Sequence, residues 1–82
     1  MSHNKDTVVK LIGERVRKLR IDKQLTLENL AFKADMDYTQ LSRIELGKIN
    51  TSLFQIHKIA IALGINSSEI LIQSSINDDG SL

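Results

Sequence analysis

The stretch from Thr26 to Glu45 constrains the fold of this chain more than any other. Its apolar residues recur every three or four positions, as on one face of each of two short helices; they are Leu27, Leu30, Ala31 and Ala34, then Leu41 and Ile44. Asp35 lies between the two runs and is among the few non-glycine residues that tolerate a left-handed backbone. Thr26 and Asp37 directly precede the runs, where their side-chain oxygens can cap free backbone N–H groups. The stretch therefore predicts two short helices joined by a tight turn.

Such a pair of helices has a recognised use. Two short helices joined by a turn of about three residues form a helix-turn-helix, whose second helix can enter the major groove of DNA. The residues before the motif predict a helix over 6–23, with a buried stripe consisting of Val8, Ile12, Val16 and Leu19. Gly13 weakens that helix, and the usual explanation of such a glycine is close packing of another element.

The residues after the motif predict two more helical segments. Apolar side chains recur on one face over 52–63, Gly64 ends that helix, and Asn66 can cap a fifth segment. The chain has no proline, four glycines and few alternating β-branched runs, which favours an all-α fold. We expect one domain over residues 1–76 and a flexible acidic tail over residues 77–82.

Several classes of protein do not fit this sequence. The absence of cysteine excludes disulfide and cysteine-based zinc frameworks and suits a cytoplasmic protein. No apolar run approaches the roughly 18 residues of a membrane span, and no signal peptide opens the chain. His3 and His57 are too few for a metal site or a histidine-based triad, and the glycines are too scattered for a phosphate-cradling loop. We therefore expect no enzyme activity, no cofactor, no metal, no membrane partner and no small-molecule ligand.

The charge of the chain is distributed unevenly, although its net value is only +1. Residues 1–23 hold seven lysines and arginines against three carboxylates, a net of +4, and residues 24–63 hold four of each. Residues 64–82 hold three carboxylates and no base, a net of −3. The pattern indicates a positive side suited to phosphate binding, with ordinary solvated charge as the alternative.

Five sequence blocks occur in a characteristic order, namely RVRKLR, LTLENLAFKA, IELGK, the NTSL loop and IAIALGI. Over about residues 9–72 this order resembles the phage repressor and Cro family, also called Xre-type. The run LAFKADMDYTQLSRIE, which leads to GKINTSL, is similar to the restriction–modification controller proteins in that family. The resemblance implies a compact five-helix domain, a transcriptional regulator that binds double-stranded operator DNA as a two-fold homodimer.

The resemblance also implies roles for particular residues. The recognition helix corresponds to residues 38–45, and its candidates for contacts with bases or flanking phosphates are Tyr38, Thr39, Ser42 and Arg43. Arg43 has the strongest physical case, because a guanidinium can donate two hydrogen bonds to O6 and N7 of guanine. The candidates for phosphate contacts are Lys48 and Asn50 in the following loop, together with Arg15 and Arg17, for which ordinary solvated surface is the alternative. Arg20 and Glu45 match the positions of an inter-helix ion pair, whose alternative is two exposed charges that never meet.

A homodimer needs an apolar surface that remains after the core is filled. The last two helical segments hold more isoleucine and leucine than so short a stretch can turn inward, and the predicted interface is Ile61, Ile70, Ile72 and Ile76. Phe32 and Phe54 are also expected to face outward. Exposed apolar residues support a competing function, a domain of helix-turn-helix shape used for protein–protein contact, as in an antitoxin or anti-regulator.

Overall fold

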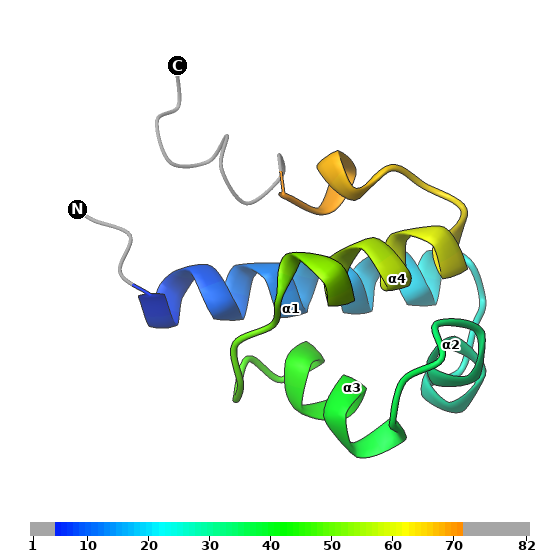
Figure 1. The fold of residues 1–82 in the computed structure, drawn as a ribbon, viewed down its shortest axis with the longest axis horizontal. Helices are drawn as coiled ribbons and strands as arrows, with labels where there is room; N and C mark the ends of the chain where they lie inside the picture. The colour runs from blue at the N-terminus through cyan, green and yellow to red at the C-terminus, as the bar shows by residue number, and fades with distance from the viewer. Residues whose placement is uncertain (1–4, 72–82) are drawn as a thin grey trace.

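The computed structural model describes residues 5–71, and every regular element in this part of the chain is helical. The helices are α1 (Lys5–Asp22), α2 (Leu27–Lys33), α3 (Tyr38–Glu45) and α4 (Leu53–Leu63). A fifth helical segment includes residues 67–71. The predicted all-α fold is therefore confirmed. Figure 1 shows α3 and the 67–71 segment on opposite sides of the long α1 helix, with α2 beyond its C-terminal end.

The helix starts follow from capping side chains. The Thr26 hydroxyl accepts from the Asn29 N–H at 3.0 Å, and the Asp37 carboxylate accepts from the Gln40 N–H at 3.2 Å. Ser52 caps α4 in the same way, accepting from the Gln55 N–H at 3.1 Å. Each cap satisfies a backbone donor that has no partner within its helix. The caps predicted for the two motif helices are confirmed.

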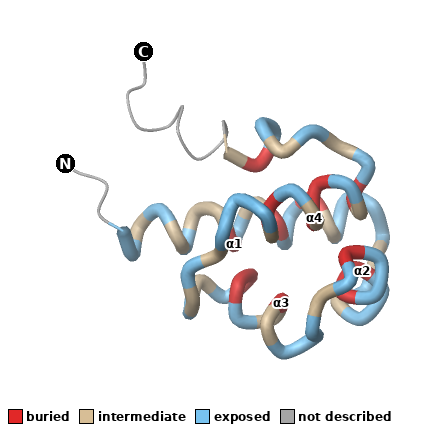
Figure 2. Tube along the Cα trace, viewed as in Figure 1, coloured by how far each residue is buried: buried red, intermediate tan, exposed pale blue. Residues whose placement is uncertain are grey.

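The core lies where the four helices and the 67–71 segment meet. Figure 2 shows buried positions in every one of these elements. The largest fully buried side chains are Val16, Leu30, Leu41, Ile44, Ile56, Ile59 and Ile70. In the described part of the chain no helix has the length and apolar character needed to cross a membrane.

Two predictions about apolar residues are wrong. Val8 was expected in the buried stripe of α1 but is 38% exposed, because the first turns of α1 extend past the ends of α3 and α4 (Figure 1). Ile70 was expected in a dimer interface but is fully buried within the monomer. Its side chain fills the core beneath the fifth helical segment, so it cannot offer contact area to a second copy. Ile72 and Ile76 lie outside the described residues.

Gly13 marks the closest approach between α1 and α3. A Cβ at this position would overlap the carbonyl oxygen of Ile44 and lie 2.8 Å from that of Glu45. These are backbone atoms of the last turn of α3, which cannot move aside as a flexible side chain would. The close packing expected at this glycine is confirmed, and it fixes the depth at which α3 sits against α1.

Replacing Gly13 by alanine tests this contact. The substitution should lower the free energy of unfolding by about 1–3 kcal/mol, the usual cost of overpacking, even though alanine favours a helix. Chemical denaturation of wild type, Gly13→Ala and the exposed neighbour Glu14→Ala provides the measurement. A Gly13→Ala protein as stable as wild type would show that α1 and α3 are not held by this contact.

Candidate nucleic-acid interface

The α3 helix presents one buried face and one solvent-facing side. Leu41 and Ile44 are buried, whereas Thr39 and Arg43 are exposed and Tyr38 is 50% exposed. Ser42 is half-buried. The four residues predicted to contact bases therefore lie on one side of α3; three of them are exposed, and Ser42 lies between Tyr38 and Thr39 around the helix axis. Together they carry hydroxyl groups, a phenol and a guanidinium, which can hydrogen-bond to base edges and phosphates.

Arg20 fixes the orientation of α3. Its Nε donates to Oε2 of Glu45 at 2.8 Å and its Nη2 donates to Oε1 at 3.0 Å, which makes the pair bidentate. Its Nη1 donates to the carbonyl oxygen of Leu25 at 2.9 Å, in the connection before α2. The predicted Arg20–Glu45 ion pair is confirmed, and it joins α1, the α1–α2 connection and α3 through one guanidinium.

This ion pair is largely removed from solvent. The side chain of Arg20 is 14% exposed and that of Glu45 is 4% exposed. The hydrogen bonds and charge of Glu45 raise the pKa of Arg20 above its ordinary value, against the opposing effect of burial. The ion pair therefore favours the charged form of the guanidinium.

The turn between α2 and α3 has its own support from α4. Asp35 adopts φ 54°, the left-handed conformation expected there, and the N–H of Met36 donates to the carbonyl oxygen of Ala31 at 2.9 Å. Nζ of Lys58 donates to the carbonyl oxygen of Asp35 at 2.7 Å. The same ammonium lies 5.5 Å from the centroid of the Phe54 ring. Sequence reasoning missed Lys58, because helical periodicity does not show which distant carbonyl a lysine reaches.

The connection after α3 turns back sharply. Gly47 adopts φ 72°, and the N–H of Lys48 donates to the carbonyl oxygen of Arg43 at 2.9 Å, which closes the last turn of α3. Lys48 and Asn50 are both exposed, directly beyond the end of α3. The Asn50 Oδ1 accepts from the N–H of Thr51 at 2.9 Å, so its amide NH₂ is the group that can donate to a phosphate.

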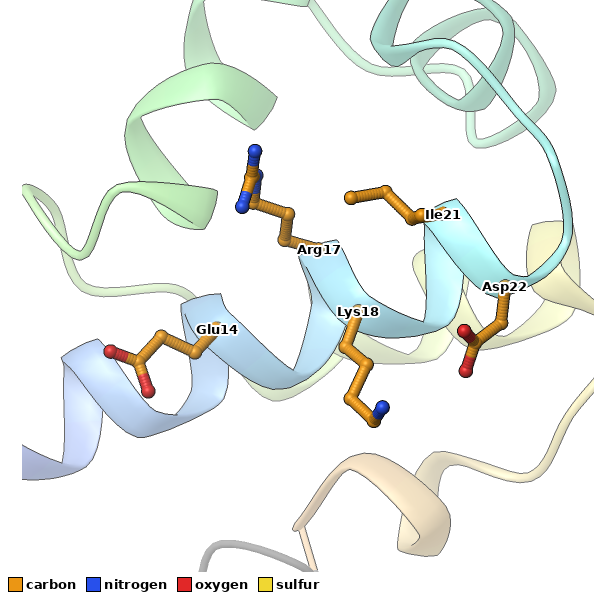
Figure 3. Close-up of a pocket in the computed structure, with 5 residues that line it drawn as sticks. All are labelled: Glu14, Arg17, Lys18, Ile21 and Asp22. Atoms are coloured by element: carbon orange, nitrogen blue, oxygen red, sulfur yellow. The ribbon is translucent and has the colours of Figure 1, made fainter.

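The two α1 arginines predicted to contact phosphates lie on different sides of their helix. Arg17 is exposed and lies one turn from Gly13 and one turn from Arg20, two residues of α1 that contact α3. Figure 3 shows its side chain directed toward α3, above a shallow depression lined by Glu14, Arg17, Lys18, Ile21 and Asp22. This depression lies along a single helix and holds no convergent set of polar groups.

Arg15 occupies the opposite side of α1. Its Nε donates to the carbonyl oxygen of Glu69 at 3.4 Å, in the fifth helical segment. At 100° per residue it points about 160° away from Gly13, which faces α3. Arg15 therefore lies on the side of α1 that faces the C-terminal segment, away from α3, and its contact with a DNA phosphate stays a prediction.

The described residues do not meet the requirements of a metal site. Across residues 5–71, no three histidine, cysteine or carboxylate side chains form a group that could hold a metal ion. His57 is an exposed residue of α4. The functional groups that converge in the described structure are the exposed side chains of α3 and the cations around its C-terminal end.

The chain is similar in sequence and in structure to known helix-turn-helix proteins. The helix-turn-helix family model matches residues 16–70 of the chain. Control protein C.BamHI of Bacillus amyloliquefaciens is 39% identical over 69 residues, which span 83% of this chain and 85% of that protein. The immunity repressor protein of Bacillus phage phi105 is 34% identical over 65 residues, which span 79% of this chain and 45% of the repressor. The crystal structure of the restriction–modification controller protein C.AhdI from Aeromonas hydrophila superposes with a TM-score of 0.73 and 41% identity, over 77% of this chain and 94% of that one.

Substitution of Arg20 should lower the free energy of unfolding more than substitution of Glu45 does. Arg20→Met leaves a buried carboxylate without its partner and should lower the free energy of unfolding by about 3–5 kcal/mol. Glu45→Gln keeps an acceptor oxygen beside Arg20 and should cost less, about 1–3 kcal/mol. Arg17→Met is the matched control, since it removes an exposed arginine from the same helix. Equal unfolding free energies for Arg20→Met and Arg17→Met would contradict a stabilising role for the pair.

Proposed function

Because this chain belongs to the Xre-type helix-turn-helix family of DNA-binding transcriptional regulators, which are not enzymes, we propose that it binds a pseudo-palindromic operator as a homodimer. In this proposal α3 of each copy enters a major groove. The observation that carries it is the exposed polar side of α3, held against α1 by the Arg20–Glu45 pair. A rigid support of this kind places the same side chains at the same base edges in every encounter.

Base reading is assigned to the exposed side of α3. Arg43 supplies the bidentate donor that suits guanine, and Thr39 supplies a hydroxyl and a methyl group that suits thymine. Tyr38 and Ser42 lie one turn apart beside Thr39, where they can reach a base or a flanking phosphate. The phosphate contacts that position α3 are assigned to Lys48, Asn50 and Arg17.

The similarity to control proteins suggests what is regulated. C.BamHI and C.AhdI are named as control proteins, the latter of a restriction–modification system, and each aligns with most of this chain. We infer that this chain regulates genes of the same kind. The presence of methyltransferase and endonuclease genes beside its own gene would support this inference, and their absence would contradict it.

Arg43→Ala tests the base-reading assignment. If Arg43 is bidentate to guanine, the substitution should weaken binding to the operator by about 1–3 kcal/mol and change binding to random-sequence duplex much less. Lys48→Ala is the control, because loss of a phosphate contact should weaken binding to both DNAs alike. An operator selected in vitro from random duplexes and titrated by fluorescence anisotropy provides the measurement. Equal losses on both DNAs for Arg43→Ala would assign it to phosphate instead.

The homodimer is assigned to the exposed side of α4. Ile61 is 64% exposed and Phe54 is 68% exposed, and their spacing of seven residues places them on one side of this helix. A two-fold axis through such a side uses the same residues from both copies, and half-sites about 34 Å apart are then read together. Ile72 and Ile76 remain part of the proposed interface, whereas Ile70 does not because it is buried.

Ile61→Asp tests this dimer. The charge should raise the dimer dissociation constant at least tenfold, because a carboxylate would be buried at the interface. Phe32→Asp is the control, since Phe32 is 88% exposed and belongs to α2. Sedimentation equilibrium of the three proteins at tens of micromolar provides the measurement. A monomeric wild type, or an Ile61→Asp protein that dimerises like wild type, would overturn the assignment.

Exposed Phe32 and Phe54 favour one other function, that of a protein–protein interaction module. An electrophoretic shift assay on duplex DNA at about 50 and 200 mM salt separates the two functions. A DNA-binding regulator should retain duplex strongly at the lower salt and far less at the higher, because phosphate contacts release counterions. No retention at the lower salt would favour the interaction module.

A further inference from the structure

Lys10 of α1 lies against the connection that follows α3. A Cβ built on Gly47 would lie 2.7 Å from Cγ of Lys10 and 3.0 Å from its Cα. The aliphatic stem of Lys10 therefore starts in direct contact with Gly47, and Lys48 is the next residue of the chain. Sequence reasoning placed Lys10 only within a basic N-terminal segment, because nothing in its spacing shows that it meets residue 47.

Gly47 makes this contact possible for two reasons. Its φ of 72° is a left-handed conformation that side chains disfavour, and its lack of a Cβ leaves room for the Lys10 stem. The same turn brings the N–H of Lys48 back to the carbonyl oxygen of Arg43. Cationic residues from α1, the last turn of α3 and the following connection are thereby gathered at one end of α3.

The described carboxylates near this end of α3 form no ion pair with those cations. Glu45 is committed to Arg20 and is buried. Asp6 and Glu14 lie one turn from Lys10 along α1, and both are exposed. Across residues 5–71 no carboxylate forms an ion pair with Lys10, Arg43 or Lys48. Three exposed cations on neighbouring stretches of backbone, none of them in an ion pair within the described part of the chain, form a surface suited to a polyanion.

We propose that Lys10 is a phosphate contact, through which α1 binds the same stretch of DNA backbone as the Gly47–Asn50 connection. The inference rests on the proposed DNA-binding function and extends the contact surface of α1 from Arg17 to its N-terminal half. A lysine suits this role, since its ammonium is a compact charge on a flexible stem that can follow a phosphate without base specificity. Packing of the stem on Gly47 restricts where the ammonium can go, which reduces the entropy lost on contact.

Lys10→Met is the informative variant, because methionine keeps an unbranched stem against Gly47 and removes only the charge. Lys18→Met is the matched control: Lys18 is exposed on the same helix, and Figure 3 shows it directed away from α3. Binding of the full-length proteins to a random-sequence duplex should be titrated by fluorescence anisotropy at several salt concentrations. Thermal unfolding of each protein, followed by circular dichroism, verifies that the variants are folded.

Lys10→Met should reduce the slope of log affinity against log salt by about 0.9, the value for one lost phosphate contact. Lys18→Met should leave the slope unchanged, and Lys10→Arg should restore the wild-type slope. An unchanged slope in Lys10→Met, beside a reduced slope in Lys48→Ala, would overturn this inference and leave the proposed function intact. A wild type that binds no duplex at low salt would instead overturn the proposed function itself.

Discussion

The arrangement of the helices depends on the hydrogen bonds that the Arg20 guanidinium donates. It satisfies both oxygens of the buried Glu45 carboxylate and the carbonyl oxygen of Leu25, so three separate segments share one cation. Glu45 could not be buried without such a partner, because an unpaired carboxylate is costly in a protein interior. The pair therefore ties the end of α3 to α1, while the apolar side chains of the core are shared among many neighbours and specify this orientation less sharply.

Two close backbone contacts also hold α3 and the connection after it against α1. Gly13 lets α3 approach α1 until the carbonyl oxygens of Ile44 and Glu45 meet the helix surface, and Gly47 lets the next connection approach Lys10. Both glycines lie where α1 meets the C-terminal half of the motif. The C-terminal end of α3 is thus held by an ion pair and by two glycine contacts that leave no room for a side chain. The solvent-facing side of α3 takes no part in these contacts and can carry polar groups.

Local signals in the sequence were sufficient for most of the fold. Caps at Thr26 and Asp37, the left-handed turn at Asp35 and the tight packing at Gly13 could be predicted because each depends on a few adjacent residues or on one residue type. The candidate site was predictable to the same extent: the exposed side of α3 follows from helical periodicity, and the Arg20–Glu45 pair follows from family resemblance.

The sequence was a poor guide where the exposure or direction of a side chain depends on packing between elements far apart in the chain. Val8 continues the apolar stripe of α1, yet among residues 5–71 no other helix reaches far enough along α1 to cover it. Ile70 lies near the end of the described chain, yet the short segment that holds it folds back and inserts it into the core. Arg15 and Arg17 are two residues apart in one basic run, and the 100° step of the helix directs Arg17 toward α3 and Arg15 toward the C-terminal segment; their phosphate contacts both stay predictions.

Lys58 connects the turn before α3 with the side of α4 that is assigned to self-association. It belongs to α4, between Phe54 and Ile61 of the side assigned to self-association, and its ammonium holds the carbonyl oxygen of Asp35 in the turn before α3. The turn and the proposed dimer surface are therefore parts of one connected structure. Because α3 is also fixed to α1 at its other end, a dimer formed through α4 would hold its two recognition helices at a defined separation. That separation would set which spacing of half-sites the protein accepts.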